Sequence, residues 1–248
     1  SVLSGIFISH TFLQNWGNMN SNVITANNIS EYISIVHQLN NSKGTYKLLY
    51  RGQNNSKYDI VPSLCHKIAE TKQTYLPYES ELIKQTKLKY PEEFGTTKND
   101  LELLSRLQHY GIPTRLLDVT LNPLVALFFA CHGTQNFSND GEVIVFSIND
   151  SSYGDDNDTL ALSSFYNFNY TISVEEFMKL NKLDYRVSHN MHTSGVERYI
   201  VTHRVPIWTQ LPEHTPRQKA QAGSYLMFPN EIEFTLYTDQ YYNSEETH

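Results

Sequence analysis

Cysteine is scarce in this chain, which has only Cys65 and Cys131 in 248 residues. Two thiols are too few for the disulfide framework of a secreted protein, so we expect a reducing cytoplasm. Each cysteine precedes a histidine, but neither pair has zinc-finger spacing. A Cys–His nucleophile stays open as an alternative, although Cys131 falls in an apolar segment where we expect a buried, inert thiol.

Long apolar runs and excess positive charge are also missing. No stretch approaches the length that spans a bilayer, and SVLSGIFISH lacks the basic start of a secretion signal, so we expect no membrane segment. The net charge of −7 argues against a protein that coats DNA through many phosphate contacts. A local basic groove is compatible with that total.

Several familiar catalytic and metal motifs are absent as well. The sequence has no phosphate-binding loop, dinucleotide glycine fingerprint, nucleophile elbow or zinc-protease helix. The aspartates of Tyr153–Asp158 lack the calcium-loop pattern. His189 and His192 have no evident third ligand, and we expect no bound metal.

The most distinctive segment that is present runs from Leu103 to Ala130. A helix capped by Asp100 should end near Tyr110, because Gly111 suits a left-handed C-terminal residue. Leu116 and Leu117 then predict a short strand that ends at Asp118. Asn122 and Pro123 fit the cap and first position of a second helix. That helix has no polar residue from Leu124 to Ala130, which predicts burial on all sides.

Polar residues lie between these two buried elements, where an unpaired group costs about 1–3 kcal/mol. They are His109, Tyr110, Thr114, Arg115, Asp118 and Thr120. They are candidates for a site. A structural alternative stays open, in which Arg115 and Asp118 pair only to hold the turn.

A second candidate segment follows a strand predicted at Tyr46–Tyr50, which delivers Arg51, Gly52 and Gln53 at its end. Glycine permits close approach of the backbone, and a guanidinium suits bidentate binding of phosphate or carboxylate. The alternative is a tight turn with a surface arginine.

The other expected elements mix helices and strands without a regular βαβ repeat, which predicts an α+β fold. They are a helix after Ser30, a helix over Tyr78–Tyr90 ended by Pro91, a buried strand at Glu142–Ile148, a helix after Ser173, a strand at Arg198–Val205, an exposed aromatic loop over Trp208–Lys219, and strands at Ala222–Phe228 and Ile232–Leu236. No linker divides the chain, so we expect a single domain over residues 29–240, with a surface arm over 1–28 and a tail over 241–248.

Three motifs resemble the FRG domain family, which is named for its Phe-Arg-Gly signature. They are Tyr50-Arg51-Gly52-Gln53, in which tyrosine replaces phenylalanine, QHYGIPTRLLDVTLNPLVALFFA from Gln108, and QKAQAGSYLMF over Gln218–Phe228. The resemblance runs from about Ile29 to Phe228, and the middle motif is long and specific.

The order of the motifs is also similar to that of ADP-ribosyltransferases, which implies a split β-sheet core with flanking helices and NAD as a substrate. Carried over, Arg51 ends the first core strand and Asp118-Val119-Thr120 lies on the second. Gln221-Ala222-Gly223 takes the place of a Gln-x-Glu strand, so Gly223 stands where a catalytic glutamate is expected. Asp118, Glu231 or Glu233 could supply the missing charge.

The resemblance assigns roles to these residues. Arg51, Asp118 and Gln221 are the expected catalytic residues, converging on one pocket. The residues expected to bind NAD are Arg51, Gln53, His109, Tyr110, Thr114, Arg115 and Thr120. Arg51 or Arg115 would hold phosphate, Tyr110 would stack on nicotinamide, and His109 would contact ribose.

The implied function is an NAD-consuming ADP-ribosyltransferase, acting as a bacterial toxin or anti-phage effector with a possible antitoxin. The expected acceptor is a macromolecule, with RNA favoured over protein or DNA, because Arg217 and Lys219 in the aromatic loop suit stacked bases and phosphate. Two alternatives stay open. One is a binding module that holds a nucleotide without reaction, and the other is a nuclease-like hydrolase that uses His109 and Asp118.

Overall fold

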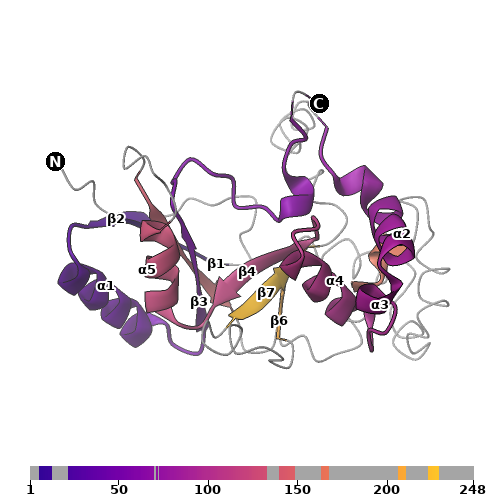
Figure 1. The fold of residues 1–248 in the computed structure, drawn as a ribbon. Coiled ribbons are helices and arrows are strands. Elements are labelled where there is room, and N and C mark those ends of the chain that lie inside the picture. The colour runs from indigo at the N-terminus through magenta and orange to yellow at the C-terminus, as the bar shows by residue number, and fades with distance from the viewer. Residues whose placement is uncertain are drawn as a thin grey trace, which may run out of the picture. The chain divides into compact units, whose positions relative to one another are not determined.

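The structure is a computed structural model that describes residues 6–12, 22–69, 71, 73–132, 140–148, 163–167, 206–210 and 223–228. It confirms the α+β class, because helices accompany a mixed sheet of seven strands (Figure 1). The chain forms two compact units. The first draws on Ser1–Ile60, Asp118–Tyr153 and Gln210–Leu226, and the second on Val61–Leu117, Gly154–Thr209 and Met227–His248.

The strands of the first unit follow the order β2-β1-β5-β3-β4-β7. Their bounds are β1 (Ile6–Phe12), β2 (Asn22–Ala26), β3 (Lys47–Gln53), β4 (Leu116–Thr120), β5 (Glu142–Ile148) and β7 (Gly223–Met227). β1 is antiparallel to β2 and parallel to β5, whereas β3 is antiparallel to both β5 and β4. The strands predicted at 142–148 and 222–228 are therefore confirmed.

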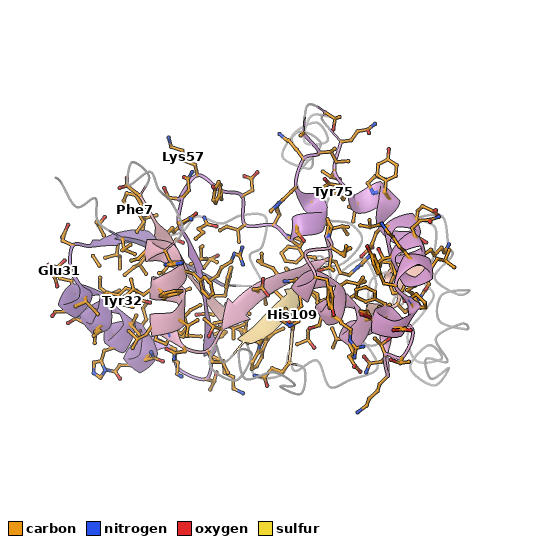
Figure 2. All side chains as sticks on the ribbon, viewed as in Figure 1. Phe7, Glu31, Tyr32, Lys57, Tyr75 and His109 are labelled. Atoms are coloured by element: carbon orange, nitrogen blue, oxygen red, sulfur yellow. The ribbon has the colours of Figure 1, made fainter. Side chains whose placement is uncertain are left out.

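Two helices, α1 (Ile29–Ser42) and α5 (Pro123–Cys131), pack on one face of this part of the sheet. The buried core beneath them includes Ile8, Tyr50 and Val145. The Tyr32 hydroxyl on α1 donates a hydrogen bond to the carbonyl oxygen of Pro123 at 2.6 Å, which joins the two helices (Figure 2).

Helices α1 and α5 both begin at an asparagine cap, but the cap of α1 is not the residue that the sequence predicts. Asn28 caps α1 with its side chain, two residues before the expected Ser30. Asn122 caps α5 and Pro123 occupies its first turn, as the sequence predicts.

Two glycines allow α5 to lie directly against the strands. A Cβ added to Gly52 on β3 would lie 1.8 Å from the carbonyl oxygen of Ala126. A Cβ on Gly141, just before β5, would lie 2.2 Å from the carbonyl oxygen of Ala130. Real Cβ atoms do not approach backbone this closely, so glycine is required by the helix–sheet distance at both positions.

The prediction that α5 is buried on all sides is wrong. Only Ala126 and Ala130 are buried, while Leu124 and Phe128 are 52% and 55% exposed. The small residues face the sheet because the close approach leaves no room for larger ones. Cys131 is consequently exposed rather than buried, although partial burial raises the pKa of its thiol.

The described residues of the N-terminal segment also differ from the surface arm expected over residues 1–28. Residues 6–12 form β1, which lies inside the sheet between β2 and β5, and Ile8 belongs to the core. The pattern of scattered aromatics among asparagines and serines hides this strand, since its partner β5 lies far away in the sequence.

The second unit contains three helices among its described residues: α2 (Glu79–Lys89), α3 (Pro91–Phe94) and α4 (Asp100–His109). Single 3-10 turns occur at Ser63–Cys65, Leu76–Tyr78 and Phe165–Asn167. Asn99, rather than Asp100, caps α4. Gly111 has a φ of 78°, which confirms the left-handed residue that ends the helix. Pro91 begins α3 in addition to ending α2.

The exposed loop predicted over Trp208–Lys219 is wrong at its start. Trp208 lies in strand β6 (Ile207–Thr209) and is only 2% exposed. Several other predictions lie outside the described residues: the helix after Ser173, the strands at Arg198–Val205 and Ile232–Leu236, and most of Trp208–Lys219. No helix in the described part has both the length and the apolar character needed to cross a bilayer.

Candidate functional site

Arg51 lies within β3, which continues through Gln53 rather than ending at Tyr50. Its neighbours Tyr50 and Gly52 face the helix layer, since Tyr50 belongs to the core and Gly52 lies under α5. Side chains alternate along a strand, so Arg51 projects from the opposite face of the sheet. The strand thereby places a guanidinium on the face away from α1 and α5.

The guanidinium of Arg51 is only partly satisfied by the protein. Its Nη1 donates to the carbonyl oxygen of Asp118 at 2.9 Å. Its Nε is buried and has no hydrogen-bond partner in the described part of the chain, and no ion pair to Arg51 is found there. Burial lowers the pKa of Arg51, and the negative charge of Asp118 opposes that effect. Arg51 as a whole is partly buried, and a cation that has lost part of its water normally has an anionic partner, so this position suits an anionic ligand.

A second unsatisfied polar atom lies on the same face. Ser9 on β1 pairs with Ile144 on β5, and Ile144 pairs with Arg51 on β3, so the three side chains form one row across three strands. The hydroxyl of Ser9 is buried and has no hydrogen-bond partner among the described residues. Strand spacing separates the Cα atoms of Ser9 and Arg51 by about 10 Å.

The next row along this face carries a carboxylate. Gln53, which is buried, donates its side-chain amide to Glu142 at 2.9 Å and to the carbonyl oxygen of Tyr58 at 3.2 Å. Both donor positions of Gln53 are thus used within the protein, and its proposed contact with NAD stays a prediction. Sequence reasoning missed Glu142, because only the β3–β5 register places it opposite Gln53.

Asp118 and Thr120 on β4 differ in exposure. The Asp118 side chain is exposed, and its carbonyl oxygen is the group that accepts from Arg51. The Thr120 side chain is buried, and its hydroxyl accepts a hydrogen bond from the backbone N–H of Asn122 at 3.0 Å. Thr120 therefore stabilises the turn that leads into α5.

Arg115 belongs to the second unit, where it pairs with Glu79 rather than with Asp118. Its Nε donates to Glu79 at 3.0 Å, and its Nη2 contacts the second carboxylate oxygen. Nη1 donates to the carbonyl oxygen of Phe228 at 3.3 Å, and the side chain is 1% exposed. The structural alternative thus named the wrong partner. These contacts occupy the guanidinium, so the structure gives Arg115 a stabilising role.

The remaining candidates of the second unit surround the end of α4. Thr114 is fully buried, and its hydroxyl donates to Gln108 at 2.7 Å. His109 and Tyr110 are exposed. The Tyr110 ring packs edge-on against Phe94, with 5.2 Å between centroids. Tyr110 is nevertheless 62% exposed, so most of the residue is open to solvent.

The structure thus brings Arg51 and Asp118 into contact within the first unit. Gln221 lies outside the described residues, so its convergence with them stays a prediction. Where the structure describes the chain, no group of three histidine, cysteine or acidic residues could hold a metal ion.

Comparison with known families finds one match. Residues 46–139 match the model of the FRG domain. The match includes the strand of Arg51 and the segment from Gln108 to Ala130, whereas the third motif at Gln218–Phe228 lies beyond it. Searches among curated proteins and among solved structures found no match.

Proposed function

Starting from the FRG domain at residues 46–139, we propose that the protein is an NAD-dependent ADP-ribosyltransferase. One observation carries the proposal. The guanidinium of Arg51 is held by a single carbonyl, with its Nε buried and unpartnered in the described part. A diphosphate would supply the missing negative charge, and its oxygens fit the planar donors of arginine.

In this proposal Arg51 binds the NAD diphosphate, and the carbonyl of Asp118 fixes the guanidinium in the orientation that the ligand meets. Gln53 orders the same face through its two donated hydrogen bonds. The contact of Gln221 with the ribose hydroxyls is part of the same proposal. Tyr110 and His109 belong to the second unit, and their contacts with nicotinamide and ribose stay predictions from the resemblance.

The biological setting is part of the proposal. We place the reaction in the cytoplasm of a bacterium, where the protein acts as a toxin or anti-phage effector controlled by an antitoxin. RNA is the favoured acceptor, supported by Arg217 and Lys219. Trp208 makes no contribution to an RNA surface, because it is buried in β6.

The decisive experiment mixes the purified chain with NAD labelled in the ADP-ribose part and, separately, with RNA, DNA and protein pools. Nicotinamide release together with a labelled acceptor supports the proposal. Arg51→Ala should reduce nicotinamide release by about 100-fold, because charge-assisted hydrogen bonds of a few kcal/mol are lost. Arg51→Lys keeps the charge but loses the bidentate fork, so we expect only partial recovery.

Arg106→Ala is the matched control, since Arg106 pairs with Glu102 along α4 and donates to the carbonyl of Glu93. Full activity in Arg51→Ala would refute the proposal. The binding-module alternative predicts tight NAD binding without turnover in the wild type. The nuclease alternative predicts cleavage of RNA or DNA in the absence of NAD.

A further inference from the structure

We infer that Glu142 supplies the carboxylate of the Arg51 site. Gly223, which stands where the resemblance leads one to expect a glutamate, cannot fill that role. The inference rests on the proposed function, because it assigns the group that acts on the ribose of NAD. It concerns residues of the first unit alone.

Glu142 and Arg51 share one face of the sheet. The hydrogen bond between the side chains of Gln53 and Glu142 shows that these paired residues project from the same side. Arg51 lies two positions before Gln53, so alternation places it on that side as well. Diagonal neighbours on paired strands have Cα atoms about 7–8 Å apart, a span that a small ligand group can fill between two long side chains.

The position of Glu142 is fixed from several directions. The backbone before it is held by hydrogen bonds from Ser56 N–H to the Asp140 carbonyl at 2.8 Å and from Phe7 N–H to the Gly141 carbonyl at 3.1 Å. Gly141 itself lies against α5. Glu142 nevertheless remains partly exposed, so its carboxylate is ordered by Gln53 and still accessible to a ligand.

Asp118 is the competing carboxylate, and the sheet places its side chain on the other face. Thr120 pairs with Tyr50, which belongs to the core beneath the helices. Asp118 lies two positions from Thr120 and therefore projects toward the helix face. Its charge raises the pKa of Arg51, but the direct contact between the two residues is made by its carbonyl.

The chemical step requires one carboxylate and no cofactor beyond NAD. The bond between C1′ of the ribose and the nicotinamide nitrogen breaks, and neutral nicotinamide leaves with the bonding electron pair. Negative charge on Glu142 stabilises the positive charge that develops on the ribose. A hydroxyl or amine of the acceptor then bonds to C1′, and its proton passes to Glu142.

The test compares Glu142→Gln, Asp118→Asn and Arg51→Ala with the wild type. The glutamine variant keeps an oxygen that accepts the hydrogen bond from Gln53, so the local structure should persist. Two readouts are measured: the affinity for inorganic pyrophosphate by calorimetry at low salt, and the rate of nicotinamide release from NAD.

Removing a negative charge beside an anion site should strengthen pyrophosphate binding about three- to tenfold in Glu142→Gln. Arg51→Ala should abolish binding. Asp118→Asn should also strengthen it, because the negative charge of Asp118 acts on Arg51. Glu142→Gln should likewise bind NAD at least as tightly as the wild type, but release nicotinamide about 100-fold more slowly, because the charge that stabilises the ribose is lost.

Unchanged pyrophosphate binding in Glu142→Gln overturns the inference, whether or not the wild type uses NAD. So does full nicotinamide release in that variant. A wild type that binds pyrophosphate through Arg51 and Glu142 but releases no nicotinamide overturns the proposed function alone, because the shared site is then present without the reaction. A wild type that binds no pyrophosphate overturns both.

Discussion

Replacing Gly52 by alanine would test how closely α5 lies on the sheet. The added Cβ would lie 1.8 Å from the Ala126 oxygen, 2.7 Å from the Ala126 carbonyl carbon and 2.8 Å from the Ala130 nitrogen. All three atoms are backbone, so no rotamer change relieves the clash. The helix must move by about 1.5 Å before the contact becomes an ordinary one.

Such a movement separates α5 from its buried contacts. A gap of 0.5–1 Å already loses about a quarter to a half of the dispersion energy of each contact. Overpacking that forces backbone shifts typically costs about 1–3 kcal/mol, and here a whole helix moves. We therefore expect Gly52→Ala to lower the free energy of unfolding by about 3 kcal/mol.

Urea denaturation followed by circular dichroism measures this effect as a lower transition midpoint with an unchanged slope. Gly141→Ala should behave alike, because its Cβ would lie 2.2 Å from the Ala130 oxygen. Gly223→Ala is the control, since no atom of the described residues lies within 4 Å of its added Cβ. A loss below about 0.5 kcal/mol in Gly52→Ala would refute the close packing of α5. Ala126→Gly should not rescue the variant, because the clash is with backbone.

Three further predictions concern buried polar groups. Glu79→Gln should cost about 3–5 kcal/mol in urea denaturation, because it leaves the Arg115 charge buried without a counter-charge, and a wild-type midpoint would contradict the buried pair. Arg51→Met should change stability by less than about 1 kcal/mol, because it leaves no carboxylate unpaired, and a loss as large as that of Glu79→Gln would mean that Arg51 serves the fold. His10, whose ring nitrogen contacts the Ser147 hydroxyl at 2.7 Å, has a pKa lowered by burial. The unfolded chain therefore binds a proton first as the pH falls below about 6.5, and stability should decline from there toward the lower folded-state pKa. Thermal melts at pH 7.5 and 5.5 should show a smaller difference in His10→Asn than in the wild type, and equal differences would contradict this origin.

Local signals explain most of what the sequence predicted correctly. Gly111 ends α4 and Asn122 with Pro123 begins α5, because capping and left-handed geometry depend on a few adjacent residues. The strand at Glu142–Ile148 was predictable from its continuous apolar run.

Features that depend on distant partners could not be read in the same way. The composition of Leu124–Ala130 does not reveal that only its alanines meet the sheet. Nothing near Arg115 indicates that its counter-charge is Glu79, 36 positions away.

Of the two charged residues of the candidate site, the sequence indicates Arg51 but not Glu142. Arg51 stands out because it precedes a glycine at the end of a predicted strand. Glu142 does not, since its place beside Gln53 follows from the β3–β5 register. A register depends on pairing between segments far apart in the chain, and no local pattern records it.

The parallel pairing of β1 with β5 constrains the order in which the protein can assemble. His10 and Ser147, which touch across these strands, are 137 positions apart. At typical rates of synthesis, roughly 10–30 s pass between the synthesis of β1 and that of β5. During that time the apolar residues of β1 need protection from other chains. Expression of the protein without its first 28 residues would also leave one edge of β5 unpaired. Because an unpaired strand edge can pair with another chain, this variant should aggregate more readily.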